Sequence, residues 1–265
     1  MIFLKKIILI LSIFPLALCQ ENLDPDVFPR PLIIEINETH LQEWPVEEVQ
    51  SQCTSWRVAG EANNLNPWKT IPEECADYVK EYMTGKGYAL DLQRVSNEAA
   101  LYARSVDLSG DGKIAWVFDV DETLLSNLPY YAEHGYGMEI FDSMKFDEWV
   151  EMGIAPAIDS SLKLYEEVLS LGFKVILLTG RSERHRNITV ENLVQAGFHE
   201  WDKLIVRSLE DQGKTATRYK SEKRNEITED GYQILGNSGD QWSDLLGSSM
   251  SIRSFKLPNP MYYIP

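Results

Sequence analysis

Four short apolar runs recur after residue 113, and segments with helical periodicity separate them. The runs are 114–118, 174–178, 203–206 and 232–235, and a fifth strand is expected near 251–255. Continuous apolar runs of this length are typical of strands that are buried on both faces of a parallel sheet. Strands that alternate with helices form βαβ units. We therefore expect an α/β fold, a three-layer Rossmann-like parallel sheet.

Helical patterns fill most of the remaining chain. After the first strand they cover 144–152, 158–171, 189–196 and 215–228; before it they cover 46–56, 72–83 and 88–104, with Gly85 and Gly87 as breaks. The expected organisation is a signal peptide over 1–19, an extended arm over 20–45, a helical lead over 46–112, a core over 113–256 and a C-terminal tail over 257–265. The lead and an insert near 126–156 are expected to form a small helical subdomain.

The first 19 residues have the layout of a secretory signal peptide, because Lys5 and Lys6 precede an apolar run over 7–18. These twelve residues would span about 18 Å as a helix, which is too short for the core of a bilayer. We therefore expect cleavage after Cys19. The product would be a secreted protein, extracellular or vacuolar, with no membrane attachment.

The chain is strongly acidic, which limits its partners. Its formal net charge is −16, and it becomes −18 when Lys5 and Lys6 leave with the signal peptide. A protein that binds nucleic acid or an anionic membrane surface needs basic patches on its own surface. We therefore expect neither as a partner, and a homodimer is an assembly that the sequence leaves open.

Two cysteines remain after cleavage, because Cys19 leaves and Cys53 and Cys75 stay. An even pair in an oxidising compartment favours a disulfide, and two buried free thiols are the alternative. We expect this bridge to pin the helical lead rather than the active site. The sequons Asn37-Glu-Thr and Asn187-Ile-Thr predict N-glycosylation.

Two carboxylates follow the first strand, at Asp119 and Asp121. Two residues apart on an extended segment, their side chains point the same way and repel each other unless a cation or a proton lies between them. Capping a helix is another use of Asp at such a position, but a cap needs only one carboxylate.

Polar residues also follow the second strand. Thr179 offers a hydroxyl and a backbone amide, and Gly180 allows a ligand to approach the backbone closely. An ordinary turn before a helix is the alternative for this tripeptide, which ends at Arg181.

The last strands lead to a second pair of acids. Asp240 and Asp244 follow the fourth strand, and the helix before it carries Lys220 and Lys223. In parallel sheets, ligands bind at the carboxyl ends of the strands. Carboxylate oxygens there suit a hard cation such as Mg²⁺.

The order of these motifs, DxDxT, TGR, a lysine and GDxxxD over about 113–246, resembles the haloacid-dehalogenase-type phosphatases. Longer segments are similar to subfamily IIIB of that superfamily, the plant acid phosphatases and vegetative storage proteins. These segments are Phe118-Asp-Val-Asp-Glu-Thr-Leu-Leu125, Leu178-Thr-Gly-Arg181, Tyr219-Lys-Ser221, Gly236-Asn-Ser-Gly-Asp-Gln-Trp-Ser-Asp-Leu-Leu-Gly247 and Cys53-Thr-Ser-Trp-Arg57, with Cys75 and Tyr78. The resemblance implies a Mg²⁺-dependent acid phosphatase for small phosphomonoesters, with a small helical subdomain and no large cap.

The resemblance also implies roles for the residues of the first two motifs. Asp119 is the nucleophile and a metal ligand. Asp121 binds the metal through its backbone carbonyl and acts first as general acid and then as general base. Thr179 and Gly180 bind the phosphoryl oxygens.

The later motifs complete the implied site. Lys220 screens charge on the phosphoryl group and the nucleophile, and Lys223, one turn away, could replace it in that role. Asp240 is a metal ligand, and Asp244 supports the metal site or the lysine.

Two other functions compete with an enzyme. One is a vegetative storage glycoprotein with low or no activity; storage members can lack the nucleophilic Asp, and Asp119 is present here. The other is a phosphate-binding module, in which Asp121 beside Asp119 would oppose anion binding. Tyr130 and Tyr131 could form an aromatic wall of the site or belong to the core.

Overall fold

The computed structural model describes residues 46–109 and 112–265, which belong to one compact unit, Trp44–Pro265. The expected signal peptide, the arm over 20–45 and the Asn37 sequon lie outside the described residues. Within them, no helix combines the length and apolar content that crossing a bilayer requires.

The core is a five-stranded sheet in the order β3-β2-β1-β4-β5, and all neighbouring strands are parallel. The strands are β1 (Ile114–Phe118), β2 (Lys174–Ser182), β3 (Lys203–Arg207), β4 (Gln233–Gly239) and β5 (Arg253–Lys256). The predicted parallel α/β fold is therefore confirmed. Every residue of the central strand β1 is buried.

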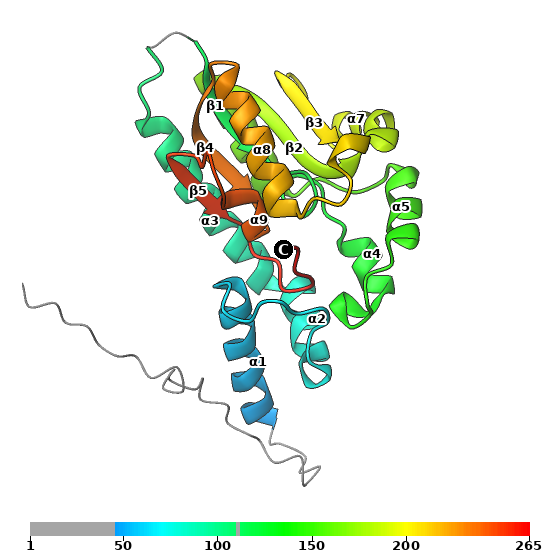
Figure 1. Ribbon diagram of the computed structural model, residues 1–265. Helices are drawn as coiled ribbons and strands as arrows, with labels where there is room; N and C mark the ends of the chain where they lie inside the picture. The colour runs from blue at the N-terminus through cyan, green and yellow to red at the C-terminus, as the bar shows by residue number, and fades with distance from the viewer. Residues whose placement is uncertain (1–45, 110–111) are drawn as a thin grey trace, which may run out of the picture. The chain divides into compact units, whose positions relative to one another are not determined.

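Helices cover both faces of this sheet (Figure 1). They are α1 (Val46–Glu61), α2 (Ala76–Thr84), α3 (Lys86–Ser105), α4 (Leu128–Glu133), α5 (Ser143–Met152), α6 (Asp159–Leu171), α7 (Arg186–Gln195), α8 (Ala216–Glu229) and α9 (Trp242–Leu245). Single 3-10 turns lie at η1 (Glu73–Cys75), η2 (Gly135–Gly137), η3 (Glu183–His185) and η4 (Leu209–Asp211).

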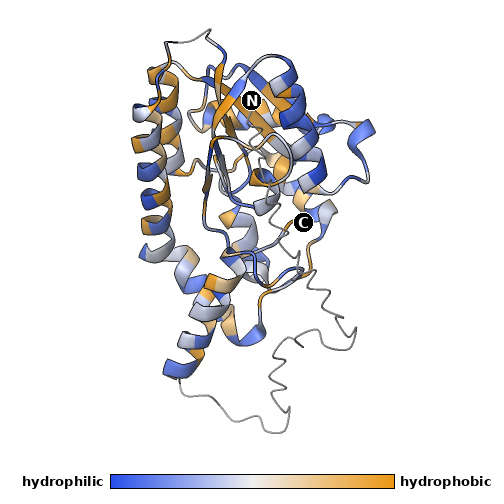
Figure 2. Ribbon diagram, turned by 60° about the vertical axis from the view of Figure 1, so that its left-hand side comes forward, coloured by the Kyte–Doolittle hydropathy of each residue, from blue (hydrophilic) through white to orange (hydrophobic). Residues whose placement is uncertain are grey.

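The alternation of β1 side chains divides the core into two layers. Ala115 and Val117 face α8 and pack against its Tyr219 and Ile227. The intervening side chains of β1, among them Trp116, face the opposite layer with α3 and α6. This arrangement follows from the period of two along a strand. In Figure 2 the strands inside the molecule are largely hydrophobic, whereas the helices around them are mixed.

Several expected boundaries differ from the observed ones. Gly87 does not break a helix: only Gly85, in an extended conformation, separates α2 from α3. α3 also joins the layer that covers the sheet, since its Tyr102 packs against Trp116 of β1 and Phe255 of β5. The division into a core and a small helical subdomain stays a proposal.

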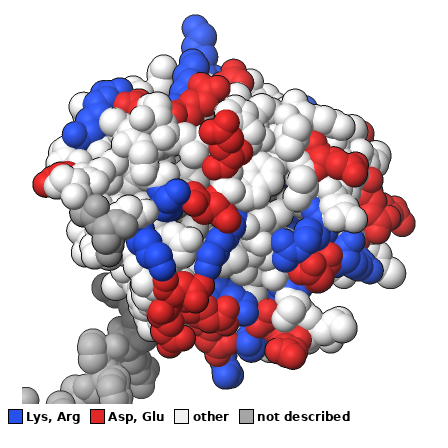
Figure 3. All heavy atoms as spheres, turned by 90° about the horizontal axis from the view of Figure 1, so that it is seen from above, with Lys and Arg blue, Asp and Glu red and all other residues white. Residues whose placement is uncertain are grey.

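Charges of both signs are mixed on the face seen from above in Figure 3. Lys174 and Lys203, the first residues of β2 and β3, pair with Asp202 and Asp230. Exposed pairs of this kind contribute little to stability.

The predicted disulfide is confirmed, because Cys53 and Cys75 are bonded. It joins α1 to η1 across a sequence separation of 22 residues. Both cysteines are buried.

Replacing Cys53 and Cys75 with Ser is expected to lower the free energy of unfolding by roughly 3 kcal/mol, because a bridge across a loop of this size restricts the unfolded chain. Urea unfolding of the variant and of the wild type measures the difference. Reduced wild-type protein should unfold like the variant. Two thiols that react with an alkylating agent in the unreduced protein would contradict the assignment.

Candidate active site

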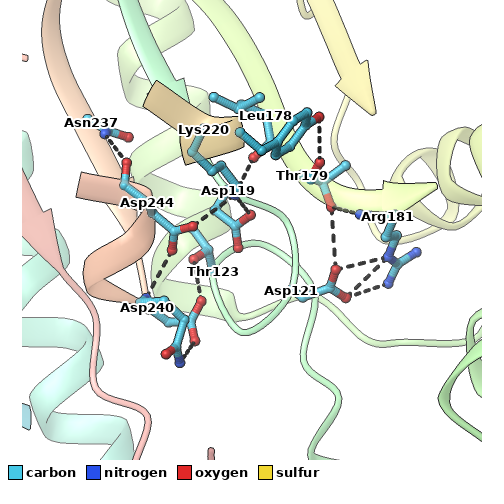
Figure 4. A network of polar contacts seen from close by, with 12 residues as sticks. Asp119, Asp121, Thr123, Leu178, Thr179, Arg181, Lys220, Asn237, Asp240 and Asp244 are labelled. Atoms are coloured by element: carbon cyan, nitrogen blue, oxygen red, sulfur yellow. Dashed lines mark hydrogen bonds and ion pairs between the residues drawn. The ribbon is translucent and has the colours of Figure 1, made fainter. Parts of the chain in front are cut away.

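The first motif forms a tight turn at the carboxyl end of β1, in the centre of the sheet. The amides of Leu124 and Leu125 donate to the carbonyl of Val120 at 2.9 Å, and Asp119 N donates to Ser238 O of β4 at 3.0 Å. Because of this turn, the Asp119 side chain lies at the carboxyl edge of β1 between the ends of its neighbours (Figure 4).

Lys220 reaches this carboxylate from α8 and is itself buried. Its Nζ donates to Asp119 Oδ1, to Asp244 Oδ1 at 2.8 Å and to the carbonyl of Leu178 at 2.7 Å. Lys223 points elsewhere and pairs with Glu226 at 2.9 Å. The structure therefore brings Lys220, and not Lys223, to Asp119.

Electrostatics explain how this buried lysine stays charged. Burial lowers the pKa of Lys220, but the carboxylates of Asp119 and Asp244 outweigh that effect, so its pKa is raised. Burial and the charge of Asp244 raise the pKa of Asp119 well above its ordinary value, and the ammonium of Lys220 opposes this rise. Lys220 thus favours the ionised form that a nucleophilic carboxylate needs.

Three buried carboxylates, of Asp119, Asp240 and Asp244, have ligand oxygens within 4.8 Å of one another. Lys220 contacts the first and the third of them. Burial and the charge of Asp244 raise the pKa of Asp240 to about 7. The cluster therefore holds more negative charge than one lysine compensates, and such a group of oxygens fits a divalent cation.

The hydrogen bonds indicate which oxygens could bind that cation. None of the described residues donates to Asp119 Oδ2, and Asp240 Oδ1 has only the Thr123 hydroxyl, at 3.5 Å. Both oxygens of Asp244 are occupied, Oδ1 by Lys220 and Oδ2 by Gln241 N at 2.9 Å. Asp119 and Asp240 thus offer free oxygens, and Asp244 supports the lysine.

Asp121 does not join the cluster with its side chain. Arg181 holds its carboxylate through two donors, Nη2 to Oδ1 at 2.8 Å and Nε to Oδ2 at 3.1 Å. Burial raises the pKa of Asp121, but Arg181 and the amide of Asn127 outweigh it and lower that pKa. The sequence motif contained Arg181, yet no role was predicted for it.

Asn127 and Trp149 support the same carboxylate, and no motif identified them. Asn127 Nδ2 donates to Asp121 Oδ1 at 2.9 Å. The amide of Asn127 is oriented by Trp149 of α5, whose Nε1 donates to Asn127 Oδ1 at 2.8 Å. The insert therefore reaches the site through one buried amide.

The second motif lies within β2, which continues past the predicted end to Ser182. Thr179 is buried, and its Oγ1 accepts from Arg181 N at 3.1 Å. Gly180 is exposed, with open space where a Cβ would stand. This exposed backbone beside a threonine suits the close approach of an oxyanion.

The two tyrosines that could form an aromatic wall have different surroundings. Tyr130 packs within the insert against Phe146 and His134. Tyr131 stacks on Tyr262 at 5.0 Å between ring centroids. Burial, followed by the charge of the nearby carboxylates, raises the pKa of both Tyr131 and Tyr262. Tyr131 thus borders the acidic site, whereas Tyr130 belongs to the core of the insert.

The second sequon lies in a helix. Asn187 is exposed in the first turn of α7, while Thr189 is buried and its Oγ1 accepts from Arg181 Nη1 at 3.3 Å. Glycosylation of Asn187 stays a prediction.

Comparison with known proteins agrees with this geometry. A family model described as "HAD superfamily, subfamily IIIB (Acid phosphatase)" matches residues 37–265. The chain is 65% identical to acid phosphatase 1 of Solanum lycopersicum over 259 residues, 98% of this chain and 99% of that protein. It is 41% identical to vegetative storage protein 1 of Arabidopsis thaliana over 217 residues, 80% of this chain and 79% of that protein. The solved class C acid phosphatase from Bacillus anthracis shares the fold, with a TM-score of 0.59 and 22% identity over 70% of this chain and 83% of that one.

Proposed function

Because this chain belongs to subfamily IIIB of the HAD superfamily, the acid phosphatases, we propose that it hydrolyses small phosphomonoesters through a phosphoryl intermediate on Asp119. That it is a phosphatase follows from the family. The covalent mechanism, the identity of the metal and the residue roles are the proposal.

One observation carries the proposal. Asp119 stands at the end of the central strand with Oδ1 held by the Lys220 ammonium, and Oδ2 accepts no hydrogen bond from the described residues. A buried carboxylate whose ionised form a neighbouring ammonium favours, and whose second oxygen accepts no hydrogen bond from the described residues, is equipped to attack phosphorus. A storage role alone would not require this arrangement.

In the first half-reaction, an oxygen of Asp119 forms a bond to phosphorus and the bond from phosphorus to the ester oxygen breaks. Asp121 gives its proton to the leaving oxygen, so an alcohol departs. Because Arg181 favours the ionised form of Asp121, this donation depends on the protonated fraction of Asp121, which increases in a mildly acidic medium.

In the second half-reaction, water attacks the same phosphorus and Asp121 takes a proton from it. The bond to Asp119 breaks, inorganic phosphate leaves and the carboxylate is restored. Thr179 and the backbone at Gly180 donate to the phosphoryl oxygens, and Lys220 reduces the repulsion between these oxygens and the carboxylates. Positioning and charge compensation of this kind are what phosphoryl transfer requires.

Phosphatases of this superfamily generally use a divalent metal, and we propose Mg²⁺ here. Asp119, Asp240 and the backbone carbonyl of Asp121 would hold it, and Asp244 would support Lys220 beside it. When bound, Mg²⁺ neutralises charge on the transferred group and on the attacking carboxylate.

Removal of the metal tests this proposal. Hydrolysis of an aryl phosphate is expected to fall to background in EDTA, because the uncompensated carboxylates then repel a phosphate dianion. Activity should return on addition of Mg²⁺ but not of Na⁺ at equal ionic strength. Full activity in protein shown by elemental analysis to be free of metal would contradict the assignment.

The setting proposed for this activity is the secretory pathway, in the vacuole or outside the cell. The disulfide and the similarity to plant storage proteins support it. A storage role can coexist with activity in one chain, and kcat of the purified protein distinguishes an active enzyme from a storage protein without turnover.

A further inference from the structure

We propose that Asn259 is a positioning residue for the metal ligand Asp240, and that Glu61 at the end of α1 holds Asn259 in place. The inference rests on the metal site of the proposed function and assigns a role to residues that no motif contains. It concerns the segment 257–265, which we expected to be a tail.

Two side-chain amides donate to the same oxygen of Asp240. Asn259 Nδ2 lies 2.7 Å from Asp240 Oδ2, and Gln241 Nε2 lies 2.8 Å from it. Both amides and the carboxylate are buried. The two donors fix the plane of the carboxylate and leave Oδ1 as the oxygen for a cation.

The orientation of both amides is set by the backbone of the C-terminal segment. Asn259 Oδ1 accepts from Met261 N at 3.0 Å, so its Nδ2 must face Asp240. Gln241 Oε1 accepts from Ile264 N at 3.0 Å, which turns its Nε2 in the same way. The segment therefore aims two donors at one metal ligand.

Glu61 anchors this segment from the other end of the chain. Its Oε1 accepts from Asn259 N at 2.7 Å, and its Oε2 accepts from Lys256 Nζ at 2.8 Å. Its backbone carbonyl accepts from Nε1 of Trp242 at 2.8 Å, and Trp242 stands two residues after Asp240. Glu61 thus joins α1 to both sides of Asp240.

This connection adds to the expected role of the disulfide. Cys53 and Glu61 belong to the same helix, α1. The bridge therefore lies within the helical lead, as expected, and it also pins the helix that anchors Asn259. Hydrogen-bond partners that orient metal ligands affect affinity strongly, and their loss typically weakens metal binding about 10- to 100-fold.

The test measures Mg²⁺ binding directly, by titration calorimetry of the mature protein without substrate. Asn259→Leu keeps the size of the side chain and removes its donor, so we expect Mg²⁺ affinity to fall about 10- to 100-fold. Excess Mg²⁺ should restore most of kcat. Asn64→Leu is the matched control, since Asn64 is exposed and is expected to bind Mg²⁺ like the wild type.

A second pair of variants keeps the test decisive if Asn259→Leu does not fold. Glu61→Gln retains an acceptor for Asn259 N, whereas Glu61→Ala removes it. We expect Glu61→Ala to bind Mg²⁺ more weakly than Glu61→Gln. Equal affinity of these two variants would contradict the role of Glu61.

Asp240→Asn separates this inference from the proposed function. If Asp240→Asn abolishes Mg²⁺ binding while folded Asn259→Leu binds as tightly as Asn64→Leu, the positioning role is wrong and the metal site stands. If Asp240→Asn binds Mg²⁺ like the wild type, the metal site itself is wrong.

Discussion

Replacing Asp119 with Asn is expected to reduce kcat by about 10⁴-fold or more, as the loss of a nucleophile does in other enzymes. An amide has the shape of the carboxylate but lacks a charged oxygen that could bond to phosphorus. Lys220 would keep its contacts with Asp244 and Leu178, so the fold should survive. Steady-state hydrolysis of an aryl phosphate measures the loss, and intact mass confirms that the amide has not deamidated.

The same change at a remote aspartate provides the control. Asp77 is exposed in α2, and Asp77→Asn should retain the activity of the wild type. If Asp119→Asn kept more than a small fraction of kcat at saturating substrate and Mg²⁺, another group would have to be the nucleophile.

Replacing Asp121 with Asn is expected to reduce activity to a degree that depends on the leaving group. Alkyl phosphates release a strongly basic oxygen that needs a proton, so we expect losses of about 10²- to 10⁴-fold, the usual contribution of a general acid. Aryl phosphates need little protonation and should lose less. The rates for a matched aryl and alkyl pair measure this difference.

The ion pair with Arg181 affects how this variant is interpreted. Asp121→Asn leaves the buried guanidinium of Arg181 with weaker partners, which is expected to destabilise the fold. A loss of folded protein would lower both rates equally and leave their ratio unchanged. Equal losses for aryl and alkyl substrates, in protein shown to be folded, would therefore contradict a general-acid role for Asp121.

The sequence predicted the structure best where hydrophobic burial and periodicity alone determine a secondary-structure element. The apolar run at 114–118 coincides with β1, because a short continuous apolar segment in an α/β chain is typical of a strand that is buried on both faces. The parallel sheet then brings Asp119, Thr179 and Asp240 together, since the carboxyl ends of its strands meet at one edge. Three widely separated motifs could thus be combined into one site.

Which of the two lysines reaches Asp119 depends on tertiary packing. Lys220 and Lys223 lie within one turn of the same helix, and the sequence does not fix how that helix rotates on the sheet. Tyr219 and Ile227 bury their side chains against β1, and this packing turns Lys220 toward Asp119. Helix boundaries shifted for a similar reason, as at Gly87, where the packed α3 tolerates a residue of low helical propensity.

Contacts between distant segments could not be predicted at all. Glu61 and Asn259 are polar residues that belong to no recognised sequence motif, and 198 positions separate them. No periodicity or spacing relates them, and only the closed fold does. Arg181 differs from these two residues. It stands two positions after Thr179 in the second motif, and from the end of that strand its long side chain could reach the first motif.

The covalent intermediate is the central claim, and acid-quench trapping tests it most directly. Wild-type protein is mixed with an aryl phosphate that carries labelled phosphate, quenched in acid within milliseconds and digested, and the labelled peptide is identified. We predict label on the peptide that contains Asp119, more of it in Asp121→Asn because hydrolysis of the intermediate still needs the base, and none in Asp119→Asn. Label at this site in Asp119→Asn, or full turnover with no trapped label in both the wild type and Asp121→Asn, would contradict the mechanism.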